Sequence, residues 1–261
     1  MNMPGLATST WLLFRTQFSR VWWSRRALAC FALAATTPAM AWIVAAFSET
    51  SGAEIATNLG WLLLLQVIVP LLALVSGSAV ITEEIEDRTI TYLFSRPIPR
   101  AAVLLGRWLA ALLFVATLLA IAAILTVFFA SWSAHPGPPL DAGITLPLLE
   151  AVLVGGAVYS AIFAALGVFL RHPMIVGLGY AFAIEGFLAN LPGRNQALTV
   201  QYHLRCLVAS TGSDAWQQVE GFEAIRFDSA TSAVVTLAIV LVVVLAAASW
   251  RITRREFVLS A

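Results

Sequence analysis

The sequence contains no lysine, so all fifteen of its lysine-or-arginine positions are arginines. A phosphate-binding loop for ATP ends in Gly-Lys-Ser or Gly-Lys-Thr, because the ammonium group and the backbone amides together hold the phosphates. Without that lysine the chain cannot hydrolyse ATP by the usual route, and energy for transport would have to come from another chain or from an ion gradient. Covalent lysine chemistry is excluded for the same reason.

Residues that bind metals or act as nucleophiles are also scarce. The three histidines are scattered, and the two cysteines, Cys30 and Cys206, are far apart in the chain, so no metal-ligand spacing is present. The arginines are spread among several segments, which argues against nucleic acid as a partner. The sequence therefore predicts no catalytic residue, no metal and no cofactor in this chain.

Charged residues make up only 11% of the chain, whereas 60% of its residues are hydrophobic and its mean hydropathy is +0.88. A soluble domain of this length cannot hide so much apolar surface, which predicts an all-α integral membrane protein with a single transmembrane domain over residues 1–261. Six apolar runs approach the roughly 20 residues that a helix needs to cross a bilayer. They are Ala27–Phe47, Leu59–Ile81, Trp108–Ala130, Pro147–Leu170, Met174–Leu191 and Thr231–Trp250.

Arginine placement predicts the orientation of these six runs. Twelve of the fifteen arginines fall before the first run, between the second and third, between the fourth and fifth, or after the sixth. Positive charge is retained on the cytoplasmic side, so these segments and both termini are expected in the cytoplasm. The other three arginines share residues 192–230, an outer loop in which we expect one or two short helices on the outer surface.

Residues 1–26, which precede the first run, carry a pattern of aromatic side chains. Trp11, Phe14 and Phe18 recur at three- and four-residue intervals, with arginines and polar residues elsewhere. This spacing predicts an amphipathic helix that lies in the membrane interface with aromatic anchors. Contact with a partner protein is an open alternative, because the helix pattern itself indicates only the bilayer.

The loop over residues 82–107 is the longest strongly charged stretch of the chain. It opens with four acidic residues, Glu83, Glu84, Glu86 and Asp87, in five positions. Because residues 83–94 contain no glycine or proline and alternate charged and apolar faces, we expect a helix that continues the second run or restarts just after it. Pro97 and Pro99 then stop this helix, and Pro99 suits the first turn of the next one.

One enzymatic interpretation of this loop is weak. The letters EEIEDR match the Glu-Glu-x-x-x-Arg motif of CAAX-type intramembrane proteases, whose second motif is Phe-x-x-x-His. The positions four residues before the three histidines hold Ser131, Val168 and Thr199, so the second motif is missing. The first motif also falls in a loop that is expected in water, which leaves this protease as a remote alternative.

A second resemblance covers more of the chain. The stretch EEIEDRTITYLFSRPIPRAAVLLGRWLA resembles the signature of ABC-2-type permeases, which links the second and third of six spans. Two positions depart from the usual pattern, because Arg88 stands where glycine is frequent and Gly106-Arg107 replaces Gly-Lys. The residues that the resemblance assigns to coupling with an ATPase are Glu83, Glu84, Glu86, Asp87, Arg88, Thr89, Leu93, Pro97 and Arg100.

The resemblance implies a membrane subunit of an ATP-driven transporter, usually an exporter, in a bacterial cytoplasmic (inner) membrane. Such a subunit pairs with a second copy, as a homodimer or with a close paralogue, and with separate ATPase subunits that bind ATP and Mg²⁺. The loop between spans two and three would be the coupling helix that docks on the ATPase. The alternative for the loop is a solvated segment whose charges only keep it out of the bilayer.

A gradient-driven carrier or channel is the alternative function. Such a protein would show broken helices or several charges within the membrane, and Glu185 is the one clear case here. Glu185 and Gln66 are expected at matching depth, where they could share a hydrogen bond and face the translocation pathway. If the fifth run is short, Glu185 instead reaches the outer interface. The transported substrate is not indicated by the sequence.

Overall fold

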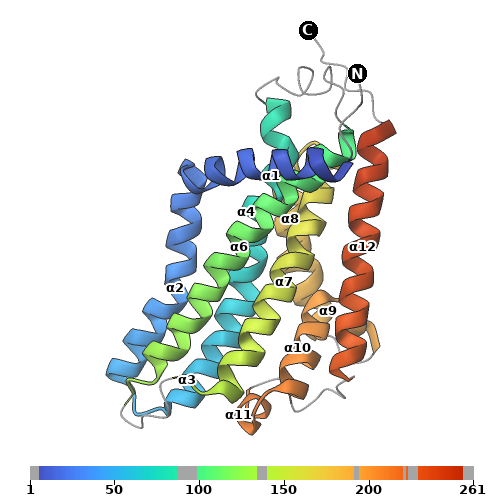
Figure 1. Cartoon of the computed structure of the whole chain (residues 1–261). Helices are drawn as coiled ribbons and strands as arrows, with labels where there is room; N and C mark the ends of the chain where they lie inside the picture. The colour runs from blue at the N-terminus through green and yellow to red at the C-terminus, as the bar shows by residue number, and fades with distance from the viewer. Residues whose placement is uncertain are drawn as a thin grey trace.

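The computed structural model describes residues 6–86, 99–133, 140–190, 194–219, 222 and 229–254. Within these ranges the chain forms a bundle of helices that run up and down roughly along one axis, with one helix lying across an end (Figure 1). Five helices are long and apolar enough to cross a membrane. They are Arg25–Phe47, Gly52–Val80, Arg100–Ala130, Ala142–Phe169 and Ala230–Arg254.

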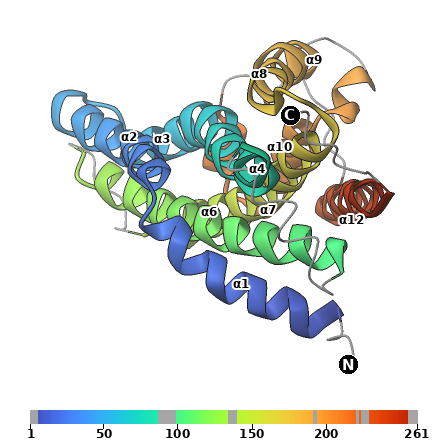
Figure 2. The same ribbon diagram turned by 90° about the horizontal axis from the view of Figure 1, so that it is seen from above.

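The helix that lies across the bundle is α1 (Leu6–Trp22) (Figures 1 and 2). Its aromatic side chains form a ladder, with ring centroids 5.3 Å apart for Trp11 and Phe14 and 5.7 Å apart for Phe14 and Phe18. A sharp turn follows, in which the hydroxyl of Ser24 accepts a hydrogen bond from the Ala27 N–H and so caps α2 (Arg25–Phe47). Insertion of α1 into the membrane interface stays a prediction.

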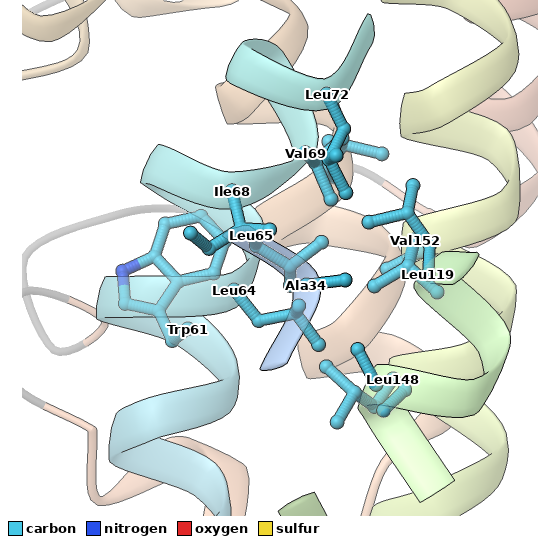
Figure 3. Packing of buried hydrophobic residues seen from close by; sticks show 14 of the residues in the cluster. Ala34, Trp61, Leu64, Leu65, Ile68, Val69, Leu72, Leu119, Leu148 and Val152 are labelled. Carbon is cyan, nitrogen blue, oxygen red and sulfur yellow. The ribbon is translucent and has the colours of Figure 1, made fainter. Parts of the chain in front are cut away.

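The second span is built from three consecutive helical segments. These are α3 (Gly52–Asn58), the π-helical η1 (Leu59–Ile68) and α4 (Val69–Glu86). This span forms the centre of the core, where Trp61, Leu64 and Leu65 are buried. Figure 3 shows its side chains facing Leu119 and Leu148 of the neighbouring helices.

The third and fourth spans are α6 (Arg100–Ala130) and α7 (Ala142–Phe169), and both pack on α4. The approach of α4 to α7 depends on small residues, as is usual between membrane helices. A Cβ atom on Gly77 would lie 2.8 Å from the Ser160 carbonyl oxygen, so only glycine allows this backbone contact. The Ser160 hydroxyl also accepts a hydrogen bond of 3.1 Å from the Trp108 indole N–H, which ties α6 to α7.

The predicted fifth span is shorter than the other five. It consists of α8 (Pro173–Gly179), the π-helical η2 (Tyr180–Glu185) and α9 (Gly186–Asn190). Its apolar part, Pro173–Leu188, does not reach the length of the five candidate spans. At 1.5 Å per residue it extends about 24 Å, less than the roughly 30 Å of a hydrocarbon core.

The outer segment corrects one expectation from the sequence. It contains η3 (Arg194–Leu198), α10 (Val200–Thr211) and α11 (Asp214–Gln217), but α10 does not lie on the outer surface. Every residue from Val200 to Val208 is buried, because α10 packs among the spans against α7 and α12 (Ala230–Arg254). The last span, α12, buries far less of itself, namely Ala233, Leu237, Ala248 and Ile252.

The two ends of the bundle differ in the segments that they carry. The end of α4, the start of α6, helix α1 and the end of α12 share one end, while α3 and α11 lie at the other (Figure 1). This arrangement matches the orientation that the arginines indicate. Cysteine labelling tests it, in a protein whose two native cysteines, the buried Cys30 and Cys206, are replaced first.

Cysteines at Ser51 and Asp214, which are both exposed at the α3 and α11 end, are expected to react with a membrane-impermeant maleimide in intact cells. A cysteine at the exposed Arg25, at the opposite end, is expected to react only after permeabilisation. Ser133 is unsuitable as an outer site, because it is only 4% exposed. Labelling of position 25 in intact cells would reverse the orientation.

Candidate functional site

The predicted coupling residues lie around the connection from α4 to α6. Glu83, Glu84 and Glu86 are in the last turns of α4, which continues the second span without a break, and Arg100 is the first residue of α6. Pro99 immediately precedes α6 as its N-cap and does not occupy its first turn. The other predicted coupling residues lie outside the described residues, and they are Asp87, Arg88, Thr89, Leu93 and Pro97.

Two neighbouring residues of α6 hold this end of the molecule together. Gly106 lies where α1 crosses α6, and a Cβ atom there would be 2.7 Å from the Thr10 carbonyl oxygen and 2.9 Å from the Leu13 Cβ. The next residue, Arg107, is only 5% exposed and donates a hydrogen bond of 3.4 Å to the Val80 carbonyl of α4. Gly106 therefore allows α1 to pack closely on α6, and Arg107 links α6 to α4.

The predicted pathway residue Glu185 is buried at the end of η2, with 1% of its surface exposed. Its carboxylate accepts hydrogen bonds from the Tyr159 hydroxyl of α7 and, at 2.6 Å, from the Tyr180 hydroxyl of its own helix. The Val200 N–H at the start of α10 donates a third hydrogen bond, of 3.4 Å. Glu185 therefore joins three segments of the chain through donors that compensate for its loss of water.

The contact between Tyr180 and Glu185 depends on the π-helical geometry of η2. In an α-helix, two residues five positions apart point about 140° away from each other around the axis. In a π-helix, where hydrogen bonds join residues i and i+5, such residues lie close to the same face. The contact of Tyr180 with Glu185 therefore could not be predicted from their spacing in the sequence. The other partner of Glu185, Tyr159, lies in a different span.

The second predicted pathway residue, Gln66, lies in the other π-helical segment, η1. The sequence explains why the helix is π-helical here. An α-helical turn would pair the Gln66 carbonyl with the N–H of residue 70, but residue 70 is proline and has no N–H. The Val69 N–H pairs with the Leu64 carbonyl, one residue further back than in an α-helix. Gln201 of α10 then donates its side-chain amide to the Gln66 carbonyl, at 3.4 Å.

The start of α10 thus contacts both π-helical segments. Thr199 caps α10 by accepting from the Tyr202 N–H at 3.1 Å, and the next two residues reach Glu185 and Gln66. Within the described residues no direct hydrogen bond joins Gln66 to Glu185, so their predicted link is replaced by one that passes through α10. π-Helical turns are frequent at functional sites, which marks this junction as a candidate site. A role of either residue in the translocation pathway stays a prediction.

A buried cation lies further along α10. Arg205 is 5% exposed, and its guanidinium carbon lies 4.7 Å from the centroid of the Trp61 ring and 5.7 Å from that of Phe222. An arginine side chain remains charged in proteins. The aromatic faces stabilise this charge through cation–π contacts. Within the described ranges, no group of three histidine, cysteine or acidic residues is placed to hold a metal ion.

The comparisons with known proteins are consistent with this arrangement. A family model described as "ABC-2 family transporter protein" matches residues 13–257, a range that extends from the middle of α1 to just past the end of α12. The comparison with curated proteins finds no match. The match covers all five candidate spans and the charged connection between α4 and α6.

Proposed function

The chain belongs to the ABC-2 family of transporter proteins, and from this premise we propose that it is the membrane subunit of an ATP-driven exporter. The observation that carries the proposal is the family match over residues 13–257, which includes every candidate span. The absence of lysine supports a division of labour, because a chain without a phosphate-binding lysine needs a separate ATPase subunit that binds ATP and Mg²⁺.

In this proposal the chain works as a dimer with two ATPase subunits in the bacterial inner membrane, with both termini in the cytoplasm. The second membrane subunit is either a copy of this chain or a close paralogue. Segment Pro173–Leu188 serves as the sixth membrane segment, although it is shorter than the other five. The residues between α4 and α6 form the coupling element.

The position of this element supports docking on an ATPase. The connection joins the two helices that contact the centre of the bundle, and the Arg107 hydrogen bond to Val80 links those helices at its base. Through Gly106 the same region contacts α1. A partner that pushes on the connection would therefore move α1, α4 and α6 together.

A gradient-driven carrier is the second candidate, because the two π-helical segments and the buried Glu185 interrupt the regular spans. Dependence on an ATPase separates the two functions. A carrier would transport without any ATPase subunit, whereas the proposed exporter would stop when that subunit is removed. The family match gives no support to an intramembrane protease.

Charge reversal tests the proposed coupling. Replacing Glu83 and Glu84 with arginine is expected to lower co-purification of the ATPase subunit roughly tenfold at low salt, with a smaller loss at high salt, because charges at an interface are screened. The readout is the ratio of ATPase to membrane subunit after affinity purification, together with ATP turnover of the complex. The purified membrane subunit alone is expected to show no turnover.

The control is Asp214→Arg, a reversal of an exposed acidic residue at the other end of the bundle, which is expected to leave the ratio unchanged. An unchanged ratio after reversal of Glu83 and Glu84 would support the solvated loop instead. ATP turnover by the isolated chain would contradict the division of labour between subunits.

A further inference from the structure

A partly open cavity of about 270 Å³ lies at the α1 end of the bundle and is lined by residues of α1, α2, α4 and α6. Figure 2 looks down on this end and shows the ribbons of α1, α2, α4 and α6 from above. The volume corresponds to about nine water molecules at the density of the liquid, which is enough for a phosphate group with part of an attached alcohol. Its lining includes Gln17, Arg20, Ser24, Arg26, Ser76 and Arg107.

The cationic side chains at this cavity come from three different helices. Arg20 belongs to α1, Arg26 to the first turn of α2 and Arg107 to α6. None of the described residues that line the cavity is acidic. Three arginines that line one cavity favour an oxyanion, because the forked N–H groups of a guanidinium match the oxygen atoms of carboxylates and phosphates.

Helix geometry adds further positive potential at the same place. Ser24, Arg26 and Ala27 line the cavity, so the N-terminus of the 23-residue α2 opens onto it. The first turn of a helix carries a partial positive charge that attracts anions, although the Ala27 N–H is already bonded to the Ser24 hydroxyl. On α1, Arg20 and Val21 lie three and four residues after Gln17, which places all three on one side of the helix, toward the cavity.

We infer that this cavity is a binding site for a phosphate ester, and that the ligand is the headgroup of an anionic phospholipid from the cytoplasmic leaflet. The phosphate would contact Arg20, Arg107 and the start of α2, with Gln17 and Ser76 as hydrogen-bonding neighbours. A lipid is favoured over a soluble phosphate ester because of α1, which lines one side of the cavity. This helix carries exposed Trp11 and Leu12, as expected of a helix at headgroup depth. Basic pockets between membrane helices on the cytoplasmic side bind such headgroups elsewhere.

Arg26 and Arg107 already have other interactions within the chain, among them the hydrogen bond from Arg107 to the Val80 carbonyl. A ligand must compete with these contacts, and because its own contacts are electrostatic we expect binding that weakens as ionic strength rises.

The test uses the full chain in lipid nanodiscs of phosphatidylcholine with or without phosphatidylglycerol. Phosphatidylglycerol is expected to raise the melting temperature and to be retained in native mass spectrometry after purification. Arg20→Gln and Arg107→Gln are each expected to weaken this retention about fivefold. Because Arg20 is exposed, its variant keeps the test valid if Arg107→Gln does not fold.

Two further variants distinguish specific binding in the cavity from general attraction of lipids to surface arginines. Ser76→Met keeps every arginine but fills the floor of the cavity, and it is expected to reduce retention. Arg254→Gln removes an exposed arginine from the end of α12, where it lies over the Trp250 ring, and is expected to change nothing. Equal losses in Arg254→Gln and Arg20→Gln would overturn the inference, as would unchanged retention in Ser76→Met and Arg20→Gln.

A second arm identifies the source of the phosphate. Inorganic phosphate and glycerol phosphate are added to protein in phosphatidylcholine nanodiscs, against chloride at equal ionic strength. A melting-temperature rise that Arg20→Gln abolishes would assign the site to a soluble phosphate ester and contradict the lipid headgroup. A rise with phosphatidylglycerol only would support the headgroup, and no rise in either arm would overturn the site.

Discussion

Replacing Gly106 with valine is expected to separate α1 from α6 and to expose α1 to proteolysis. Even the first carbon of a side chain at this position would lie 2.7 Å from the Thr10 carbonyl oxygen and 3.2 Å from the Phe14 backbone nitrogen. Backbone atoms of a packed helix cannot rotate out of the way, so the whole of α1 has to shift. Overpacking of this kind typically destabilises by about 1–3 kcal/mol.

Limited trypsin digestion measures this displacement. Arg15 and Arg20 lie on α1 and are exposed, so cleavage at both is expected to accelerate once the helix loses its contact with α6. If the proposed coupling is correct, co-purification of the ATPase falls as well. Gly179→Val is the matched control, because a Cβ atom at Gly179 would meet no atom outside its own helix within 4 Å, unlike one at Gly106. Equal cleavage of the two variants would show that the α1 contact does not depend on Gly106.

Replacing Glu185 with leucine is expected to destabilise the bundle by roughly 2–5 kcal/mol, because buried donors would lose their acceptor. The Tyr159 hydroxyl lies on a side chain with no exposed surface, so water cannot replace the carboxylate. The Val200 N–H would also lose a partner, which weakens the attachment of α10. Glu185→Gln retains a carbonyl acceptor, and a smaller loss is expected for it.

Thermal unfolding of the purified protein measures these losses, and a double variant tests whether the lost hydrogen bond causes them. Adding Tyr159→Phe to Glu185→Leu removes the stranded hydroxyl and is expected to recover part of the stability, since replacing both partners by apolar groups costs little. Glu150→Leu is the matched control, because this carboxylate is exposed on α7. A double variant that is less stable than Glu185→Leu would contradict the hydrogen-bond explanation. Wild-type transport by Glu185→Gln across a range of pH would exclude a role for the ionised carboxylate.

The long spans were predictable because hydrophobic length alone identifies a membrane helix. The runs predicted around α2, α6 and α12 fall within helices of the structure, and the run Pro147–Leu170 extends one residue past the end of α7. Helix α6 begins eight residues before its predicted start at Trp108. The difference has a physical reason, since residues 100–107 continue the helix beyond the apolar part. The family resemblance also held, because it depended on a motif and a topology that agree with each other.

The position of α10 could not be predicted from the sequence. Its glutamine, histidine and arginine indicated a surface helix, but each has a partner inside the bundle. Gln201 donates to the Gln66 carbonyl, the His203 ring contacts the Ala197 carbonyl at 3.0 Å, and Arg205 lies over the Trp61 ring. Such partners come from distant or irregular segments, and no periodicity within α10 reveals them.

The length of α6 gives this helix a mechanical property. Its 31 residues extend about 46 Å, some 16 Å more than the roughly 30 Å of a hydrocarbon core. A pivot near Ala130, where α6 ends close to Gly52 of α3, would make the rest of the helix a lever arm. A tilt of about 10° around that point would displace Arg100 by about 8 Å, so a small rotation at one end of α6 would become a large displacement at the other.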